Sequence, residues 1–217
     1  MSRAVARIRL AEMLLGIGIA VAVLSTAWIA REFLKSPEMP GLVQANTQAT
    51  LLNEPLSIPG FKLVDQYGNS FTRDNLKEQW SFLFFGYTGC PDVCPTTISV
   101  LMQVEKQLKE YTDLVKPRYI FVSIDPDRDK PENLAEYMAY FHQDFLGVTG
   151  PQDQLKIMTK PLGIFYEKNS SNNESNYSIN HTTAILLVDP QARVRSLTSP
   201  PHNANTIAKD YRYVLAN

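Results

Sequence analysis

The sequence predicts an α/β sandwich with a mixed β-sheet, preceded by one N-terminal transmembrane helix. Three observations support this prediction. Short apolar runs alternate with segments of helical periodicity over residues 55–217, which is typical of α/β folds. One helical segment separates two buried apolar strands, as the crossover between parallel strands requires. An uncharged run of eighteen residues near the N-terminus is long enough to span a bilayer.

The transmembrane prediction rests on residues 13–30, MLLGIGIAVAVLSTAWIA, which carry no charge. An apolar helix of about 17–25 residues spans the hydrocarbon core of a bilayer. Arg3, Arg7 and Arg9 precede the run, and this favours a cytoplasmic N-terminus with the rest of the chain outside. A cleaved signal peptide is the alternative, but its apolar region usually has about 7–15 residues. The longer run predicts that residues 1–30 are a retained anchor.

Residues 31–54 are expected to be a linker, because they contain Pro37, Pro40 and a polar NTQAT run without sustained periodicity. The remaining residues, 55–217, suffice for one buried core. The formal net charge is −1, from 21 basic and 22 acidic residues, so we expect no cationic surface that would bind nucleic acid. Two cysteines are too few for a disulfide scaffold or an all-cysteine zinc site.

The expected domain begins with a hairpin, a buried strand and a helix. Apolar residues at 61–64 and 70–72 flank a Tyr-Gly-Asn turn at 67–69. Residues 80–87, WSFLFFGY, are an apolar run typical of a buried strand. Residues 95–111 carry apolar side chains at spacings of three and four, and this predicts a helix.

A second strand and helix follow. Residues 118–124, RYIFVSI, predict another buried strand, and residues 131–142 predict a helix with Pro131 in its first turn and Asp129 as its cap. The connecting segment, SIDPDRDKP, spaces its aspartates as a calcium loop does. Lys130 stands where such a loop requires glycine, and a strand rather than a helix precedes it, so we expect a strand-to-helix connection.

Residues 168–180, KNSSNNESNYSIN, are polar, and we expect them to form a mobile loop. Long polar loops that persist inside compact domains are often functional. The other expected elements of this half are a strand at 146–149, a helix at 152–162, a hairpin of strands at 183–188 and 192–197, and a closing helix at 203–215.

Cys90 and Cys94 stand where the strand 80–87 is expected to end and the helix 95–111 to begin. Two cysteines four residues apart can place both sulfurs on one face of a helical turn. Amides at a helix N-terminus favour the thiolate, which binds metals and attacks disulfides. The pair is therefore suited to soft-metal binding or to redox exchange. A structural disulfide is the alternative, although a bridge over so short a loop constrains the unfolded chain little.

The spacing of the ligand candidates separates these alternatives only in part. Thioredoxin-type oxidoreductases have two residues between their cysteines, whereas three lie between Cys90 and Cys94. A metal site needs a third ligand, for which the chain offers three histidines. His142 and His202 fit ordinary helical and loop positions, whereas His181 lies where the polar loop meets an apolar strand. Two thiolates and one imidazole would suit monovalent copper, while zinc would require a fourth ligand.

Several segments match the motifs of a known family in the right order. They are FGYTGCPDVCPTT at 85–97, SIDPDRDKPE at 123–132, FLGVTG at 145–150, and His181 followed by LVDP at 187–190. Together they resemble the signature of the Sco/SenC family of membrane-anchored copper chaperones, and the resemblance covers nearly all of the predicted domain. The sequence departs from the family at Asn180, where aspartate is usual, and at Thr182, where serine is common, so the support of His181 is expected to differ.

This resemblance implies a thioredoxin-like fold of the peroxiredoxin-related kind, with copper bound by Cys90, Cys94 and His181. It implies a metallochaperone, rather than an enzyme, that delivers copper to cytochrome c oxidase or matures its copper site. A thiol-disulfide reductase acting on the copper-site cysteines is the alternative. The expected partners are the copper-binding subunit of the oxidase and other copper chaperones. The expected location is the inner membrane of a bacterium, anchored through residues 13–30, with the domain facing the periplasm.

Overall fold

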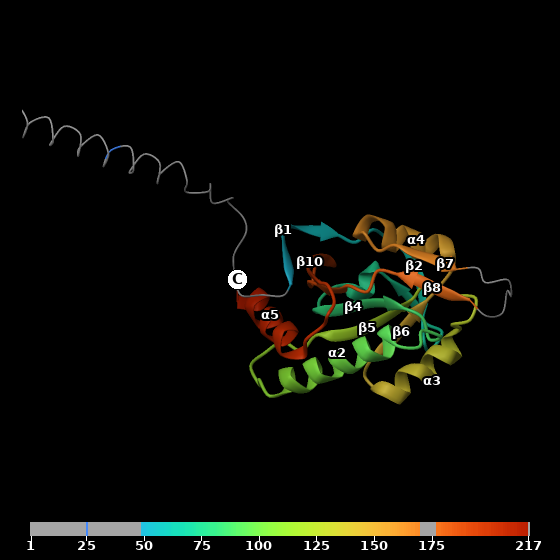
Figure 1. The fold of residues 1–217 in the computed structure, drawn as a ribbon, viewed down its shortest axis with the longest axis horizontal. Coiled ribbons are helices and arrows are strands. Elements are labelled where there is room, and N and C mark those ends of the chain that lie inside the picture. The colour runs from blue at the N-terminus through green and yellow to red at the C-terminus, as the bar shows by residue number, and fades with distance from the viewer. Residues whose placement is uncertain (1–24, 26–48, 170–176, 217) are drawn as a thin grey trace, which may run out of the picture. The chain divides into compact units, whose positions relative to one another are not determined.

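The computed structural model describes residue 25, residues 49–169 and residues 177–216. The chain divides into two units, Met1–Val43 and Gln44–Asn217, and every element labelled in Figure 1 belongs to the second. In the described stretches, no helix is both long enough and apolar enough to cross a membrane. The predicted span at residues 13–30 lies outside the described residues, apart from Ser25.

Most of the described strands form one sheet. The strands are β1 (Thr50–Ser57), β2 (Lys62–Asp65), β3 (Ser70–Thr72), β4 (Ser81–Gly86), β5 (Arg118–Ser123), β6 (Leu146–Thr149), β7 (Tyr166–Asn169), β8 (Ser178–His181), β9 (Ile185–Val188) and β10 (Arg193–Thr198). Eight of these form a sheet in the order β1-β10-β9-β4-β5-β6-β2-β3, and β7 pairs with β8 separately. The central strands β4, β5 and β6 are parallel, whereas β9 runs antiparallel to β4. The predicted mixed sheet is therefore confirmed.

Helices cover both faces of the sheet (Figure 1). They are α2 (Val93–Lys109), α3 (Pro131–Phe141), α4 (Gln152–Thr159) and α5 (Ala204–Ala216), with short 3-10 turns η1 (Arg73–Leu76) and η2 (Lys160–Leu162). Buried side chains of α2, α3 and α5 pack into one core, and those of α4 and the β7–β8 hairpin pack into the other. The molecule is thus the sandwich that the sequence predicts.

Strand β4 lies at the centre and serves both cores. Phe82 and Phe84 point into the core with α2 and α5, whereas Leu83 and Phe85 point into the core with α4. Because side chains alternate across a strand, burial on both faces explains the continuous apolar run. Strand β4 ends at Gly86. Ligand sites of α/β sheets lie beyond the carboxyl ends of such strands.

The sheet includes residues that the sequence analysis assigned to the linker. Strand β1 starts at Thr50 and pairs with β10, so the last residues of the stretch 31–54, which was assigned to the linker, belong to the sheet. The apolar pattern of this strand is weak because it lies at the sheet edge, with none of its residues fully buried. Pro55 is tolerated there, since an edge strand can lack one ladder hydrogen bond.

The polar segment 168–180 also differs from its prediction as a loop. Its first residues extend β7 and its last residues form β8, which pair in register from Tyr166 with His181 to Asn169 with Ser178. Residues 170–176 lie outside the described residues. His181 therefore ends β8 instead of opening the next strand, which begins only at Ile185. The alternation of exposed Ser178, buried Ile179 and exposed Asn180 is a strand pattern hidden in a polar composition.

Candidate metal site

Cys90, Cys94 and His181 converge beyond the carboxyl end of β4. One potential ligand atom from each residue lies within 4.8 Å of the other two. The Sγ of Cys94 is 3.7 Å from Nε2 of His181, and both cysteines are free thiols. Within the described ranges, this is the one group of three or more Cys, His, Asp or Glu side chains close enough to hold a metal ion. The fold thus brings all three predicted ligands together.

Cys90 lies in the turn between β4 and α2. Its amide donates to the Tyr87 carbonyl oxygen at 3.2 Å, and its Sγ accepts a hydrogen bond from the Cys94 amide at 3.5 Å. The sulfur thus occupies the place of a capping side chain at the start of α2. Since α2 begins at Val93, the expectation that both cysteines share one helical turn is wrong, and Cys90 precedes the helix.

Cys94 lies in the first turn of α2 and is fully buried. Burial raises the pKa of its thiol far above the ordinary value, and the Tyr87 carbonyl and nearby Cys90 are smaller influences. Burial thus opposes the thiolate that the helix N-terminus was expected to favour at this residue. A bound metal ion would have to displace the Cys94 proton.

Gly86 makes room for the Cys94 sulfur. A Cβ atom at position 86 would lie 2.6 Å from Sγ of Cys94 and 2.8 Å from Cε2 of Phe121. Both distances are too short for real atoms, so the sulfur occupies space that only a glycine leaves free. The sequence marks this glycine only as the end of an apolar strand, and the close approach depends on the packing of α2 against β4 and β5.

His181 presents a defined nitrogen to the cysteines. Its Nδ1 lies 3.0 Å from the carbonyl oxygen of Thr182. Because a carbonyl oxygen can only accept, Nδ1 carries the hydrogen and Nε2 has the free lone pair. Burial lowers the pKa of His181, which favours the neutral ring. A neutral imidazole whose second nitrogen is held by a hydrogen bond is the form that ligates metals.

Asp129 holds the cysteine turn in place. Its carboxylate, which is fully buried, accepts hydrogen bonds from the Thr88 amide at 2.9 Å and from the Thr88 hydroxyl at 2.5 Å. It accepts a third from the Ser123 hydroxyl at 2.6 Å. The prediction that Asp129 caps α3 is wrong, since Lys130 is the N-cap and makes no side-chain capping bond. Hydrogen bonds from Thr88 and Ser123 occupy the Asp129 carboxylate in place of the amides at the start of α3.

The other two histidines lie apart from the cluster. His142 has its Nε2 3.9 Å from a Glu105 carboxylate oxygen, and Nε2 of His202 donates to the Thr183 carbonyl at 2.9 Å. Beside His181 an open surface hollow of about 620 Å³ is bordered by Phe165, whose side chain is exposed. Of the three cluster residues, only His181 lines this hollow.

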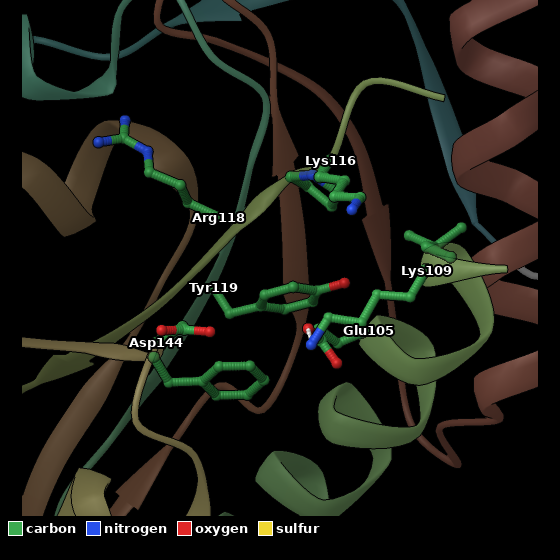
Figure 2. A pocket seen from close by; sticks show the side chains of 9 residues that line it. Glu105, Lys109, Lys116, Arg118, Tyr119 and Asp144 are labelled. Carbon is green, nitrogen blue, oxygen red and sulfur yellow. Dashed lines mark ion pairs between the residues drawn. The ribbon is translucent and has the colours of Figure 1, made fainter. Parts of the chain in front are cut away.

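A second cavity, of about 330 Å³, lies at the amino end of β5, which is the end of the central strands away from the cluster (Figure 2). Its floor includes Tyr119, and Glu105 and Lys109 form an ion pair at its rim. Neither cysteine nor histidine belongs to its lining. It therefore lacks the soft ligands of the cluster and is separate from it.

Comparison with known proteins gives a consistent family. The family model described as SCO1/SenC matches residues 50–216. The SCO2-like protein of Rickettsia felis is 33% identical over 184 residues, which are 84% of this chain and 83% of that protein. Copper-bound ScoI of Arabidopsis thaliana is 26% identical, with a TM-score of 0.69 over 74% of this chain and 99% of that chain. Copper-bound yeast Sco1 is 28% identical, with a TM-score of 0.69 over 75% of this chain and 90% of that chain. The mixed sheet matches these structures, in agreement with the thioredoxin-like fold that the sequence resemblance implies.

Proposed function

The chain belongs to the SCO1/SenC family, and on this basis we propose that it is a copper metallochaperone whose ligands are Cys90, Cys94 and His181. The observation that carries the proposal is the cluster of their ligand atoms within 4.8 Å. Ligands that share one ion at about 2.0–2.3 Å lie at most about 4.6 Å apart, so little movement would close the site. Two sulfurs and one imidazole nitrogen form a soft donor set, which suits monovalent copper.

The burial of the three ligands suggests how copper would enter and leave. Cys94 lies at the back of the site, whereas Cys90 and His181 are partly exposed. A donor group of the acceptor protein would therefore approach beside Cys90 and His181, and each new bond to copper would replace one of theirs. Copper would remain monovalent throughout, so the exchange would need no electron transfer.

The proposed setting is the inner membrane of a bacterium. Residues 13–30 would be the retained anchor, the following linker would extend as far as β1, and the domain would face the periplasm. The proposed acceptor is the copper-binding subunit of cytochrome c oxidase. The arginines before the apolar run support this orientation. An alkaline phosphatase fused to the C-terminus should be active, and the mature chain should retain residues 1–30. Mature protein that starts after residue 30 would contradict the anchor.

Thiol-disulfide reduction is the second candidate function. Two free sulfurs lie within 4.8 Å of each other, one partly exposed and one buried, which is an arrangement that favours attack by the outer thiol. This chemistry would oxidise the dithiol to a disulfide while a partner disulfide gains the two electrons and two protons. His181 separates the candidates, because copper binding should require it whereas dithiol exchange should not.

The test is an anaerobic titration of the reduced full chain, held in detergent, with monovalent copper against a chromophoric chelator. One equivalent should bind tightly, and Cys90→Ser or Cys94→Ser should abolish tight binding, because a hydroxyl is a hard, weak donor for this ion. Tight stoichiometric binding in both single variants would refute the site. If the parent chain binds no copper and His181→Ala leaves its dithiol turnover unchanged, the reductase would be favoured.

A further inference from the structure

Arg128 contacts both segments that carry the cluster. On the side of the cysteines, a Cβ atom built on Gly89 would lie 3.5 Å from Cζ of Arg128, and the guanidinium lies 5.3 Å from the centre of the Tyr87 ring. On the side of the histidine, Nη1 of Arg128 donates to the Tyr177 carbonyl at 3.0 Å. The same guanidinium lies 3.7 Å from the centre of the Tyr177 ring. One side chain thus lies between the two ligand-bearing segments.

Arg128 is itself held firmly. It pairs with Asp125, a buried carboxylate that also accepts the Tyr177 hydroxyl at 2.7 Å. The Asp125 carbonyl accepts the amides of Arg128 and Asp129 at 3.2 and 2.9 Å. Because Asp129 binds Thr88 in the cysteine turn, the same loop fixes one segment through Asp129 and the other through Arg128 and Asp125.

The position of Tyr177 determines that of His181. Tyr177 directly precedes β8, and His181 is the last residue of that strand. An extended strand advances about 3.3 Å per residue with little freedom along its axis, so holding one end restricts the other. The Ile179 amide between them donates to the Tyr87 hydroxyl at 3.3 Å, which ties the middle of the strand to the cysteine turn as well.

We propose that Arg128 is a positioning residue for the metal site: acting through Tyr177 and β8, it sets the distance between His181 and the two cysteines. The inference rests on the proposed copper site and deepens it. A ligand held in place before the metal arrives loses less conformational freedom on binding. Without Arg128, the end of β8 would have to be ordered by copper, and the affinity for copper would fall.

The first experiment measures copper affinity in the reduced full chain by chelator competition. Arg128→Met removes the charge and the donors but keeps an unbranched apolar stem, and it should weaken binding about 10–100-fold, the usual effect of losing a group that supports a ligand. Arg193→Met is the matched control. Arg193 also pairs with a buried aspartate, Asp189, at 2.8 Å. Asp189 follows the end of β9, which lies beside the start of β4, whereas the cluster lies beyond the other end of β4. This control should leave copper affinity unchanged.

A double-mutant cycle tells positioning of His181 apart from a general structural role. If Arg128 acts through His181, adding Arg128→Met to His181→Ala should change copper affinity by less than about twofold, because coupled residues are not additive. X-ray absorption of the copper complex of Arg128→Met should show less nitrogen ligation than that of the parent chain. A full additional loss in the His181→Ala background would overturn the inference, since Arg128 would then act on the cysteines or on the whole fold.

A metal-free measurement completes the test. Hydrogen exchange of the amides over residues 177–182 should be faster in Arg128→Met than in the parent chain, and Arg193→Met should not change it. If Arg128→Met does not fold, Tyr177→Phe removes only the hydroxyl bond to Asp125 and should give a smaller change of the same sign in exchange and affinity. If copper binding requires His181 but the folded variants show unchanged hydrogen exchange and unchanged copper affinity, this inference alone would be overturned. Absence of copper binding in the parent chain would overturn both this inference and the proposed function.

Discussion

The Sγ atom of Cys94 lies 3.7 Å from Nε2 of His181, although 87 positions separate the two residues in the sequence. Cys94 is delivered by the first turn of α2, and His181 by the last residue of β8. Neither segment fixes the contact by itself. The contact depends on β4, which carries the cysteine turn at its end, and on the hairpin packed against the core that β4 shares with α4.

Replacing His181 with alanine should weaken copper binding without unfolding the domain. The side chain is only partly buried and supplies one of three donors, so the loss should exceed the roughly 10–100-fold effect of removing a supporting group. Chelator competition measures the affinity, and thermal unfolding of the metal-free chain should change little. His142→Ala is the matched control, because that ring lies beside Glu105 and away from the cluster. Equal affinity in His181→Ala and the parent chain would leave a two-cysteine site.

Replacing Gly86 with alanine should damage the site and the fold together. The new methyl group would meet the Cys94 sulfur and the Phe121 ring, and overpacking of this kind typically costs about 1–3 kcal/mol. Copper affinity should fall as well, because the sulfur must move. Gly60→Ala is the control, since nothing lies within 4 Å of a Cβ at that position. Denaturant unfolding measures the stability of both variants, and chelator competition measures their copper affinity. Equal stability and equal affinity in Gly86→Ala and Gly60→Ala would contradict the steric argument.

Alkylation should distinguish the two cysteines. Cys94 is fully buried and burial raises its thiol pKa, whereas Cys90 is partly exposed. Because the thiolate is the reactive form, a short pulse of iodoacetamide on the native, metal-free chain should label Cys90 at least about tenfold faster than Cys94. Peptide mass spectrometry measures the two yields. In denaturant the yields should become similar, and fast native labelling of Cys94 would contradict its burial.

Stability of the reduced, metal-free chain should fall in alkaline solution because of Cys94. The raised pKa means that the folded chain keeps a proton that the unfolded chain releases near the usual thiol value of about 8.5. This contribution is fully present below that pH and is lost as the pH rises above it. One group lowers the free energy of unfolding by at most about 1.4 kcal/mol per pH unit. Denaturant unfolding between about pH 8.5 and 9.5 should show a flatter dependence in Cys94→Ala.

Replacing Asp129 with asparagine should loosen the cysteine turn. The carboxylate accepts three hydrogen bonds with both oxygens. An uncharged amide of the same shape either sets its NH2 group against the Thr88 amide or forces the Thr88 hydroxyl to accept instead of donate, and it loses the bonds to a charged acceptor. The free energy of unfolding should fall by about 1–3 kcal/mol, with a lower copper affinity. Asp153→Asn is the control, because this carboxylate is exposed on α4 and should change stability by less than about 0.5 kcal/mol. Equal stability of the two variants would remove Asp129 from its anchoring role.

Local patterns in the sequence predict most of the fold. The apolar run at 80–87 and the spacing after Pro95 are signals within a few residues of each other, and they predict β4 and α2 to within one or two residues. The edge strand β1 was missed because a strand with few buried residues carries little periodicity. Strand β8 was missed because its composition is polar, and only pairing with β7 makes the pattern recognisable.

The sequence by itself determined which residues are candidates for soft-metal chemistry, since two cysteines and three histidines offer thiolate and imidazole ligands and the motifs around Cys90, Cys94 and His181 resemble one family. Tertiary structure decided how these residues are arranged and supported. It placed the Cys94 sulfur in the space left by Gly86, turned Asp129 from a predicted helix cap into the anchor of the cysteine turn, and set Arg128 between that turn and Tyr177. These roles arise from contacts between segments distant in the chain. A local sequence pattern therefore cannot predict which donors a buried carboxylate will bind.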